Sequence, residues 1–185
     1  MPAGSAQDDR VAPEELQYGI DITGLDPGSL TDALRAVITD VMTDPIRMST
    51  WLASFALAEQ NVGLNMLRRF AGETPAATAF QGDKRFAEPE WKENPILAGV
   101  VEDYRARTDA ALQLVDSARL PEATRRKARF AMQLMCDAFA PSNIPWLNPG
   151  VVKEATETQG QSLVRGLQNF LDDVANNGGY PRQVD

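Results

Sequence analysis

Residue types that usually carry catalysis are scarce in this chain. Among its 185 residues there is one cysteine, Cys136, and there is no histidine. A thiol nucleophile needs a neighbouring base, most often histidine, to take its proton. Cys136 also lacks the small flanking residues that a nucleophile elbow requires, since it follows Leu134-Met135. We therefore expect Cys136 to be a small apolar residue inside a helix, and we expect no catalytic residue in this chain.

Acidic pairs are the other candidates for chemistry, and their spacing is unfavourable. Adjacent acids occur at Asp8-Asp9, Glu14-Glu15 and Asp172-Asp173. Neighbouring residues on a helix point in different directions, so such a pair does not converge on one metal ion. The chain also has no glycine-rich loop of the kind that holds a phosphate. We expect it to bind no metal and no cofactor.

The overall charge narrows the choice of partners. The net charge is −8, from 26 acidic and 18 basic residues. Nucleic-acid affinity comes mainly from Lys and Arg that neutralise phosphates, so we expect no nucleic-acid partner. No apolar stretch is long enough for a membrane span. The first residues do not have the pattern of a signal peptide, and a single cysteine fits a reducing compartment, so we expect a cytoplasmic protein.

Helix start signals recur along the chain and indicate the fold class. Asp44-Pro45, Asn94-Pro95 and Asn148-Pro149 each place a capping Asx directly before a proline. The Asx side chain accepts a bond from a free N–H of the first turn, where proline loses nothing by lacking its own. No segment shows the alternation of a strand. The sequence predicts an all-α domain of five or so amphipathic helices over residues 29–185, preceded by a flexible arm over residues 1–28.

These starts and the apolar periodicity set the expected helices. They cover residues 29 or 31 to 42, 45–70, 88–91, about 95–115, 121–139 and 149 to about 174, the last as one helix stopped by Asn177-Gly178-Gly179. A loop is expected over residues 72–87. In the helix that opens at Pro121, the residues expected to face inward are Phe130, Leu134, Ala138 and Phe139.

The second predicted helix is apolar over most of its circumference. Between Met48 and Leu67 its only charged residue is Glu59, and Trp51 and Phe55 are its large aromatics. Such a helix is either central to a core or covered by another domain, subunit or polymer. Both interpretations stay open, with Met48, Trp51 and Phe55 as candidate interface residues.

Two runs of polar and aromatic residues are the most distinctive feature of the sequence. The first is Asp83-Lys84-Arg85-Phe86-Ala87-Glu88-Pro89-Glu90-Trp91, followed by Asn94-Pro95. The second, about 50 residues later, is Asp137-Ala138-Phe139-Ala140-Pro141-Ser142-Asn143, followed by Asn148-Pro149 and Leu163-Val164-Arg165-Gly166. In this order and spacing they resemble the N-terminal domain of polyhydroxyalkanoate synthases, which polymerise 3-hydroxyacyl-CoA into storage polyester. The resemblance runs from about Gly82 to Gly179. The family often has a Gly-Gly pair and an asparagine where this chain has Gln159-Gly160 and Gln161-Ser162.

The resemblance implies a role for the chain. It implies a helical accessory domain that lies against an α/β-hydrolase-like catalytic domain, which is absent from this chain and whose Gly-x-Cys-x-Gly cysteine carries the growing polyester. Cys136 does not correspond to that cysteine. The implied partners are the catalytic domain of the same synthase, a second copy in a homodimer, and a polyester granule surface or a phasin, which places the protein at granules in the cytoplasm.

Several residues acquire expected roles from this resemblance and from their types. Phe86 and Trp91 look like anchors that fix the loop before the helix at Pro95, and both are also candidate interface residues. Arg85 and Arg165 are candidates for interdomain hydrogen bonds, because a guanidinium can bind carboxylates or carbonyls in a fork.

A basic cluster follows Pro121 in the sequence. Arg125 and Arg126, followed by Lys127 and Arg129, lie in the first turns of the predicted helix, where cations oppose the helix dipole. They are either a solvated or internally paired face or a contact for an acidic partner or a CoA phosphate.

Three functional hypotheses remain. The chain is the non-catalytic N-terminal domain of a synthase, a free-standing phasin-like protein on granules, or an unrelated helical ligand-binding or regulatory domain. The first predicts a natural reading frame that continues past Asp185 into a nucleophile elbow. The second predicts granule adsorption without a catalytic partner, and the third predicts a closed internal cavity.

Overall fold

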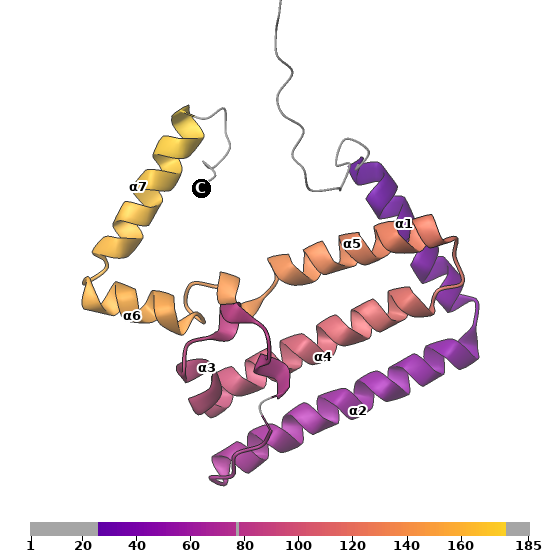
Figure 1. Ribbon diagram of the computed structural model, residues 1–185, viewed down its shortest axis with the longest axis horizontal. Coiled ribbons are helices and arrows are strands. Elements are labelled where there is room, and N and C mark those ends of the chain that lie inside the picture. The colour runs from indigo at the N-terminus through magenta and orange to yellow at the C-terminus, as the bar shows by residue number, and fades with distance from the viewer. Residues whose placement is uncertain (1–25, 77, 177–185) are drawn as a thin grey trace, which may run out of the picture.

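The computed structural model describes residues 26–76 and 78–176, and this part of the chain contains seven α-helices and no strand (Figure 1). The helices are α1 (Pro27–Met42), α2 (Pro45–Phe70), α3 (Glu90–Glu93), α4 (Pro95–Ser117), α5 (Glu122–Ala138), α6 (Pro149–Glu157) and α7 (Gln161–Asn176). Short 3-10 helices lie in the connections: η2 (Thr78–Phe80), η3 (Lys84–Phe86) and η4 (Pro141–Asn143). The predicted all-α fold is confirmed. Most of the expected arm and the stop signal at 177–179 lie outside the described residues.

Asx-Pro pairs start four of the helices. The Asp44 side chain accepts a hydrogen bond from the Arg47 backbone N–H at 3.1 Å. Asn94 and Asn148 likewise each accept from two backbone N–H groups of the first turn of α4 and α6. The fourth pair is Asp26-Pro27, whose carboxylate accepts from the third residue of α1. This pair starts α1 at Pro27, two residues before the earliest predicted start.

The C-terminal end of α2 explains why this long helix stops where it was predicted to stop. Gly72 has a φ of +85°, in the left-handed region that only glycine adopts readily. The Gly72 N–H donates to the Arg69 carbonyl and the Glu73 N–H to the Arg68 carbonyl, at 3.0 and 2.9 Å. These two bonds form a Schellman motif, which satisfies carbonyls that the last turn would otherwise leave free.

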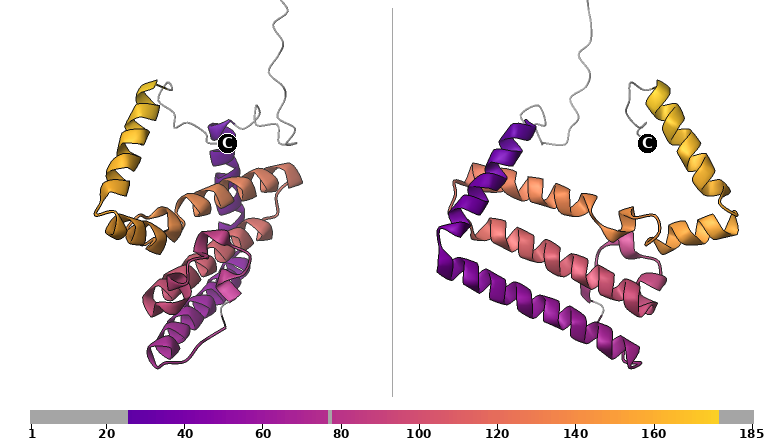
Figure 2. Two further views of the ribbon diagram at one scale, coloured as in Figure 1. Left: turned by 60° about the vertical axis from the view of Figure 1, so that its left-hand side comes forward. Right: turned by 180° about the vertical axis from the view of Figure 1, so that it is seen from behind.

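The central helix of the fold is α4. Helices α2, α4 and α5 lie side by side with α4 in the middle, and α1 crosses them at one end and packs mainly on α5 (Figures 1 and 2). One core cluster lies where α1, α4 and α5 meet and includes Val37, Val41 and Val115. A second lies at the other end of α4, where Phe86, Trp91 and Val101 are buried under the connection between α2 and α4.

The inward face of α5 differs from the prediction. Phe130, Leu134, Ala138 and Phe139 are all exposed, and the exposed fraction of Phe139 is 77%. The buried residues of α5 are instead Ala128 and Ala131. Small side chains let α5 approach its neighbours closely, so the alanine stripe faces the core and the bulky stripe faces outward. Periodicity alone favours the bulky stripe and selects the wrong face.

The predicted final helix is in fact two helices. Its first part, α6, ends at Glu157, and α7 starts at Gln161 in a different direction (Figure 1). Between them Gln159 and Gly160 have φ values of +51° and +83°. The Gly160 N–H donates to the Ala155 carbonyl and the Gln159 N–H to the Thr156 carbonyl. This is a second Schellman motif, with glutamine at the left-handed position where α2 has glycine.

Candidate interaction surface

Aromatic packing fixes the connection between α2 and α4. Phe86 in η3 and Trp91 in α3 are fully buried, and their rings meet edge to face with centroids 5.2 Å apart. Tyr104 of α4 adds a third ring, whose centroid lies 6.0 Å from that of Phe86. The connection therefore closes one end of the core. Neither Phe86 nor Trp91 is exposed to a partner in this arrangement.

The Arg85 guanidinium is bound within the chain. It donates to both carboxylate oxygens of Asp83, and its Nη1 donates to Oδ1 of Asp137 at 2.9 Å. It also lies 5.8 Å from the centroid of the Tyr104 ring, within the range of a cation–π contact. Arg85 thus connects η3 to the end of α5, so the two distinctive runs of the sequence meet here, 52 residues apart along the chain.

Asp83 is the centre of this polar cluster. Besides Arg85, its carboxylate accepts a hydrogen bond from Arg105 of α4, and Asp83 caps the start of η3 through the Arg85 backbone N–H. The side-chain hydrogen bond from Arg85 is the main cause that lowers the pKa of Asp83, against the opposing effect of burial. The cluster holds an ionised carboxylate between two guanidinium groups, which is a structural arrangement with no nucleophile.

The second helix has one covered face and one uncovered face. The indole Nε1 of Trp51 donates to the Ala110 carbonyl of α4 at 2.8 Å, and the Trp51 and Phe55 rings stack with centroids 5.8 Å apart. Met48 packs against the core cluster of α1, α4 and α5. The rest of the helix surface leaves several large apolar side chains exposed: Ile46, Leu52, Leu57, Leu64 and Leu67. The three candidate residues therefore lie on the face toward α4.

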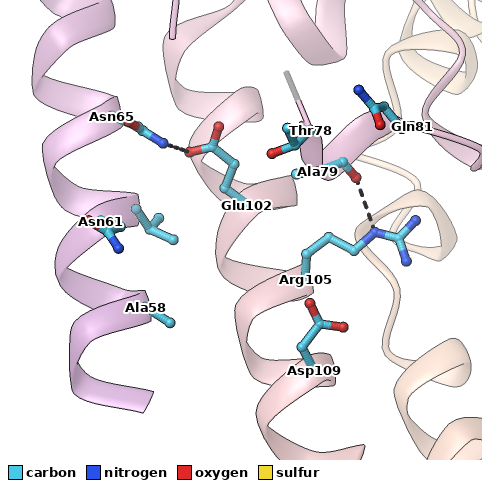
Figure 3. Close-up of a pocket in the computed structure, with 10 residues that line it drawn as sticks. Ala58, Asn61, Asn65, Thr78, Ala79, Gln81, Glu102, Arg105 and Asp109 are labelled. Atoms are coloured by element: carbon cyan, nitrogen blue, oxygen red, sulfur yellow. Dashed lines mark hydrogen bonds between the residues drawn. The ribbon is translucent and has the colours of Figure 1, made fainter. Parts of the chain in front are cut away.

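A polar cavity of about 520 Å³ lies between α2, α4 and the η2 turn (Figure 3). Glu102 of α4 lines it, accepts from Asn65 of α2 at 3.3 Å and pairs with Arg69. Arg105 crosses its other side and donates to the Ala79 carbonyl at 3.2 Å (Figure 3). The lining combines carboxamides, carboxylates and one guanidinium, and Glu102 and Arg105 are paired with Arg69 and Asp83, which lie outside the lining.

The basic cluster of α5 is paired within the chain. Arg125 and Arg126 both form ion pairs with Glu122 one turn earlier, and Arg129 pairs with Asp116 at the end of α4. Glu122 in the first turn also complements the helix dipole that these cations oppose. Arg126 keeps most of its side chain in solvent, so it stays accessible to an acidic group.

An apolar groove of about 380 Å³ lies between α4 and α5. Its lining includes Tyr104 and Ala111 from α4, Met132 and Met135 from α5, and Phe139 directly after α5. Cys136 also lines it, as a partly buried thiol among apolar neighbours. Methionine side chains adapt to irregular apolar surfaces, so the groove suits a hydrophobic partner better than a polar ligand.

A further uncovered apolar surface is on α7. No residue of this helix is buried, and Leu163, Val164, Leu167, Phe170 and Leu171 are all exposed. Arg165 is exposed too, and at 100° per residue it lies about 200° around the helix from Leu163. Arg165 and the apolar stripe therefore face different sides of α7.

Comparison with known proteins decides the family. The family model described as "Poly-beta-hydroxybutyrate polymerase (PhaC) N-terminus" matches residues 82–185. The match starts one residue before Asp83 and includes the whole connection of η3 and α3 together with α4–α7. The chain belongs to this family. The range that matches the family thus covers both sequence runs that meet at the Arg85–Asp137 ion pair.

Full-length polymerases extend the similarity to the first two helices. The chain is 35% identical over 164 residues, 89% of its length, to "Poly(3-hydroxyalkanoate) polymerase 2" of Ectopseudomonas oleovorans. It is 31% identical over 88% of its length to polymerase 1 of that organism. It is 33% identical over 59% of its length to "Poly(3-hydroxyalkanoate) polymerase subunit PhaC" of Rhizobium meliloti (strain 1021). The chain spans 28%, 28% and 18% of these relatives. No solved structure matches the chain.

The described part of this member of the polymerase N-terminus family has several uncovered apolar surfaces. Among residues 26–76 and 78–176, no group of three or more His, Cys, Asp or Glu side chains could hold a metal ion. None of the described helices has the length and apolar character to cross a membrane. Sequence reasoning missed the uncovered face of α5, because it assigned the bulky residues of this helix to the core. The available signal was the alanine stripe of α5, Ala128 and Ala131.

Proposed function

We propose that this chain is the non-catalytic N-terminal domain of a polyhydroxyalkanoate synthase. The synthase would transfer 3-hydroxyacyl groups from CoA to a growing polyester, with the chemistry in the portion that the relatives have beyond this segment. The domain would support dimerisation, granule association and stability of the polymerase at the granule surface in the cytoplasm. The observation that carries the proposal is the match of residues 82–185 to a polymerase N-terminus, in a chain that spans 28% of the polymerase it resembles over most of its length.

The chemistry of the chain supports an accessory role. There is no histidine to act as a base for Cys136, and this thiol lines an apolar groove whose rim charges, Asp103 and Arg107, pair with each other at 2.8 Å. An acyl transfer through a cysteine needs a base within hydrogen-bond reach. The reactive cysteine of the proposed synthase would therefore lie in another part of the polymerase.

The uncovered apolar faces support a role in assembly. Large side chains are exposed along α2, α5 and α7, and Trp146 between η4 and α6 is 77% exposed. Moving one such side chain fully out of water contributes about 1.5–3 kcal/mol. Several of them together suffice for association even after the ordering costs of binding are subtracted.

A chimera tests the proposal directly. This chain would replace the matching segment of polymerase 2 from Ectopseudomonas oleovorans, and CoA release from 3-hydroxyacyl-CoA would be measured. The expected result is a soluble chimera with CoA release, and a matched chimera with an unrelated helical domain of similar size would lack it. Equal activity of both chimeras, or none with this chain, would contradict the proposal.

A second experiment asks whether the domain acts when it is not covalently linked. CoA release from 3-hydroxybutyryl-CoA would be measured for a polymerase that lacks its N-terminal segment, first alone and then with this chain added. We expect a higher rate or a shorter lag when the chain is present. The result also reports on assembly, because light scattering on the same mixture detects the complex.

A phasin-like granule protein is the second candidate, and α7 is the observation that favours it. An amphipathic helix with an uncovered apolar stripe and a polar opposite face suits an apolar surface. This candidate predicts that the isolated chain adsorbs to polyester particles, and that the chimera gains nothing from it in CoA release. Adsorption together with CoA release by the chimera would favour the synthase domain.

A further inference from the structure

Helix α7 is the least covered element of the described fold. It has 16 residues, none of them buried, and its main packing partner is the short helix α6. Figures 1 and 2 show it projecting away from the layer of α2, α4 and α5 in all three views. A helix of this length has little stability alone in water, so its apolar face is expected to find a partner in the working protein.

The apolar residues of α7 form one stripe. Leu163, Leu167, Phe170 and Val174 follow each other at spacings of four, three and four residues, and Val164 and Leu171 widen the stripe on one side. This is the pattern of a helix that packs one face into a partner. The opposite side carries Gln161, Arg165, Gln168 and Asp172, which suit solvent. The stripe therefore has the size and order of a docking face.

The junction before α7 holds this helix in a defined direction. Gln159 and Gly160 adopt left-handed conformations that end α6. The Thr158 hydroxyl accepts a hydrogen bond from the Ser162 backbone N–H at 3.1 Å, which caps the first turn of α7. A hydrogen-bonded turn therefore sets the direction in which α7 carries its apolar stripe.

We propose that the apolar stripe of α7 is the surface by which this domain docks onto the C-terminal remainder of its polymerase. The inference rests on the proposed function and names the surface through which it works. In the relatives, most of the polymerase lies outside the segment that this chain matches, and the family model assigns that segment to the N-terminus. The remainder thus follows α7 in chain order, and α7 is the described helix nearest to it.

The covalent link between this domain and the remainder of the polymerase favours that remainder as the partner of the α7 stripe. A partner in the same polypeptide binds in an intramolecular step, at an effective concentration that the connecting segment sets, so a stripe of moderate area can be sufficient for docking. The α2 stripe and the α4–α5 groove lie farther from that connection along the chain. The docking face on the remainder is expected to be apolar and uncharged opposite Leu167 and Phe170.

Amide hydrogen exchange in the chimera with polymerase 2 tests the inference. In the isolated chain, the α7 amides should exchange at least tenfold faster than those of α4. In the chimera the α7 amides should become at least tenfold better protected than in the isolated chain. The double variant Leu167→Asp/Phe170→Asp should lose this protection, whereas the matched variant Gln168→Asp/Asn169→Asp on the polar side of the same helix should keep it.

A milder pair guards against a failure to fold. Leu167→Ala/Phe170→Ala keeps α7 helical and should still lose most of the protection, while the amides of α4 stay as in the unmodified chimera. Circular dichroism of the isolated variants should match that of the unmodified chain, because the stripe makes few contacts within it.

The outcomes separate the inference from the proposed function. A chimera that releases CoA while its α7 amides stay unprotected overturns the inference and leaves the proposed function standing. A folded chimera without CoA release contradicts the proposed function. Protection of α7 that appears only when polyester particles are added also overturns the inference, because the stripe would then bind the polymer surface.

Discussion

Arg69 of α2 and Glu102 of α4 form an ion pair in which both side chains are more than nine-tenths buried, with 8% and 7% of their surfaces exposed. Asn65 donates to the second carboxylate oxygen of Glu102. The pair joins the end of α2 to the middle of the fold, close to the polar cavity of Figure 3. A buried charge is strongly destabilising without its partner, so the charge of each residue in this pair compensates the burial of the other.

Removing one residue of the Arg69–Glu102 pair should therefore lower the free energy of unfolding strongly, whereas replacing both residues by apolar ones should change it little. Glu102→Gln leaves the Arg69 guanidinium without its counter-charge and should lower the free energy of unfolding by about 3 kcal/mol. The double variant Arg69→Met/Glu102→Leu should lie within about 1 kcal/mol of the unmodified chain, because it removes both charges. Urea unfolding followed by circular dichroism measures both. Equal losses in the single and double variants would contradict the coupling.

The two faces of α2 should respond differently to truncation. Trp51→Ala and Phe55→Ala remove side chains that pack on α4, and each should cost about 2–3 kcal/mol, less than a fully buried aromatic because both are partly exposed. Leu57→Ala and Leu64→Ala on the exposed face should change stability by no more than about 0.5 kcal/mol. Thermal unfolding of the four variants decides whether Trp51 and Phe55 are core residues or contact residues for a partner. Unchanged stability of the aromatic variants would assign that face to an interface.

Acid should weaken the polar cluster around Asp83. The pKa of Asp83 is lowered in the folded chain, mainly by the Arg85 side-chain hydrogen bond. A depressed folded pKa adds stability above the unfolded pKa of about 3.9, and this stability is lost as the pH falls through the folded pKa. The free energy of unfolding should therefore fall below about pH 4 in the unmodified chain.

The variant Asp83→Asn isolates this contribution. It should be less stable by about 2 kcal/mol at pH 7, since it loses hydrogen bonds from two guanidinium groups to a charged acceptor. Its stability should also change less between pH 5 and pH 3 than that of the unmodified chain. Denaturant titrations at three pH values provide the comparison. A parallel fall in both proteins would place the acid sensitivity elsewhere.

Local signals account for much of this fold. Helix starts at Asp44, Asn94 and Asn148 could be predicted because an Asx-Pro pair has one physical meaning at a helix N-terminus. The anchoring roles expected of Phe86 and Trp91 agree with their full burial. The inward face of α5 was predicted wrongly, because apolar periodicity gives most weight to bulky residues, whereas the residues that face the core are the small Ala128 and Ala131.

The apolar periodicity of the sequence does not show which apolar faces stay uncovered in the fold. A stripe such as that of α7 looks the same in sequence whether it faces a core or solvent. Its exposure follows from the turn at Gln159, and a glutamine gives no local signal of a left-handed conformation. The candidate interface residues Arg85 and Arg126 were identifiable by type, but their ion pairs with Asp137 and Glu122 depend on the folded geometry.

The turn between α6 and α7 should tolerate glycine better than glutamine. Gln159 has a φ of +51°, and a residue with a side chain loses about 1–2 kcal/mol in that conformation, partly offset by the greater freedom of glycine in the unfolded chain. Gln159→Gly should therefore stabilise the turn by about 0.5–1 kcal/mol. Gly160→Ala should act in the opposite direction, because Gly160 has a φ of +83° although no atom would contact the added carbon. Exchange rates of the Gly160 and Ser162 amides measure both effects.

A variant of Arg165 separates two ideas: that Arg165 forms an interdomain hydrogen bond, as the sequence suggests, and that α7 docks through its apolar stripe. As an interdomain hydrogen-bond donor, Arg165 would lose its contact in Arg165→Ala, and the α7 amides of the chimera would lose protection. If the apolar stripe docks, Arg165 stays on the solvent side of α7, because it lies about 200° around the helix from Leu163. Arg165→Ala should then leave the exchange of α7 unchanged within twofold, while Leu167→Asp/Phe170→Asp abolishes the protection. Loss of protection in both would mean that the remainder of the polymerase surrounds α7 from two sides, since one flat partner cannot contact the stripe and Arg165 together.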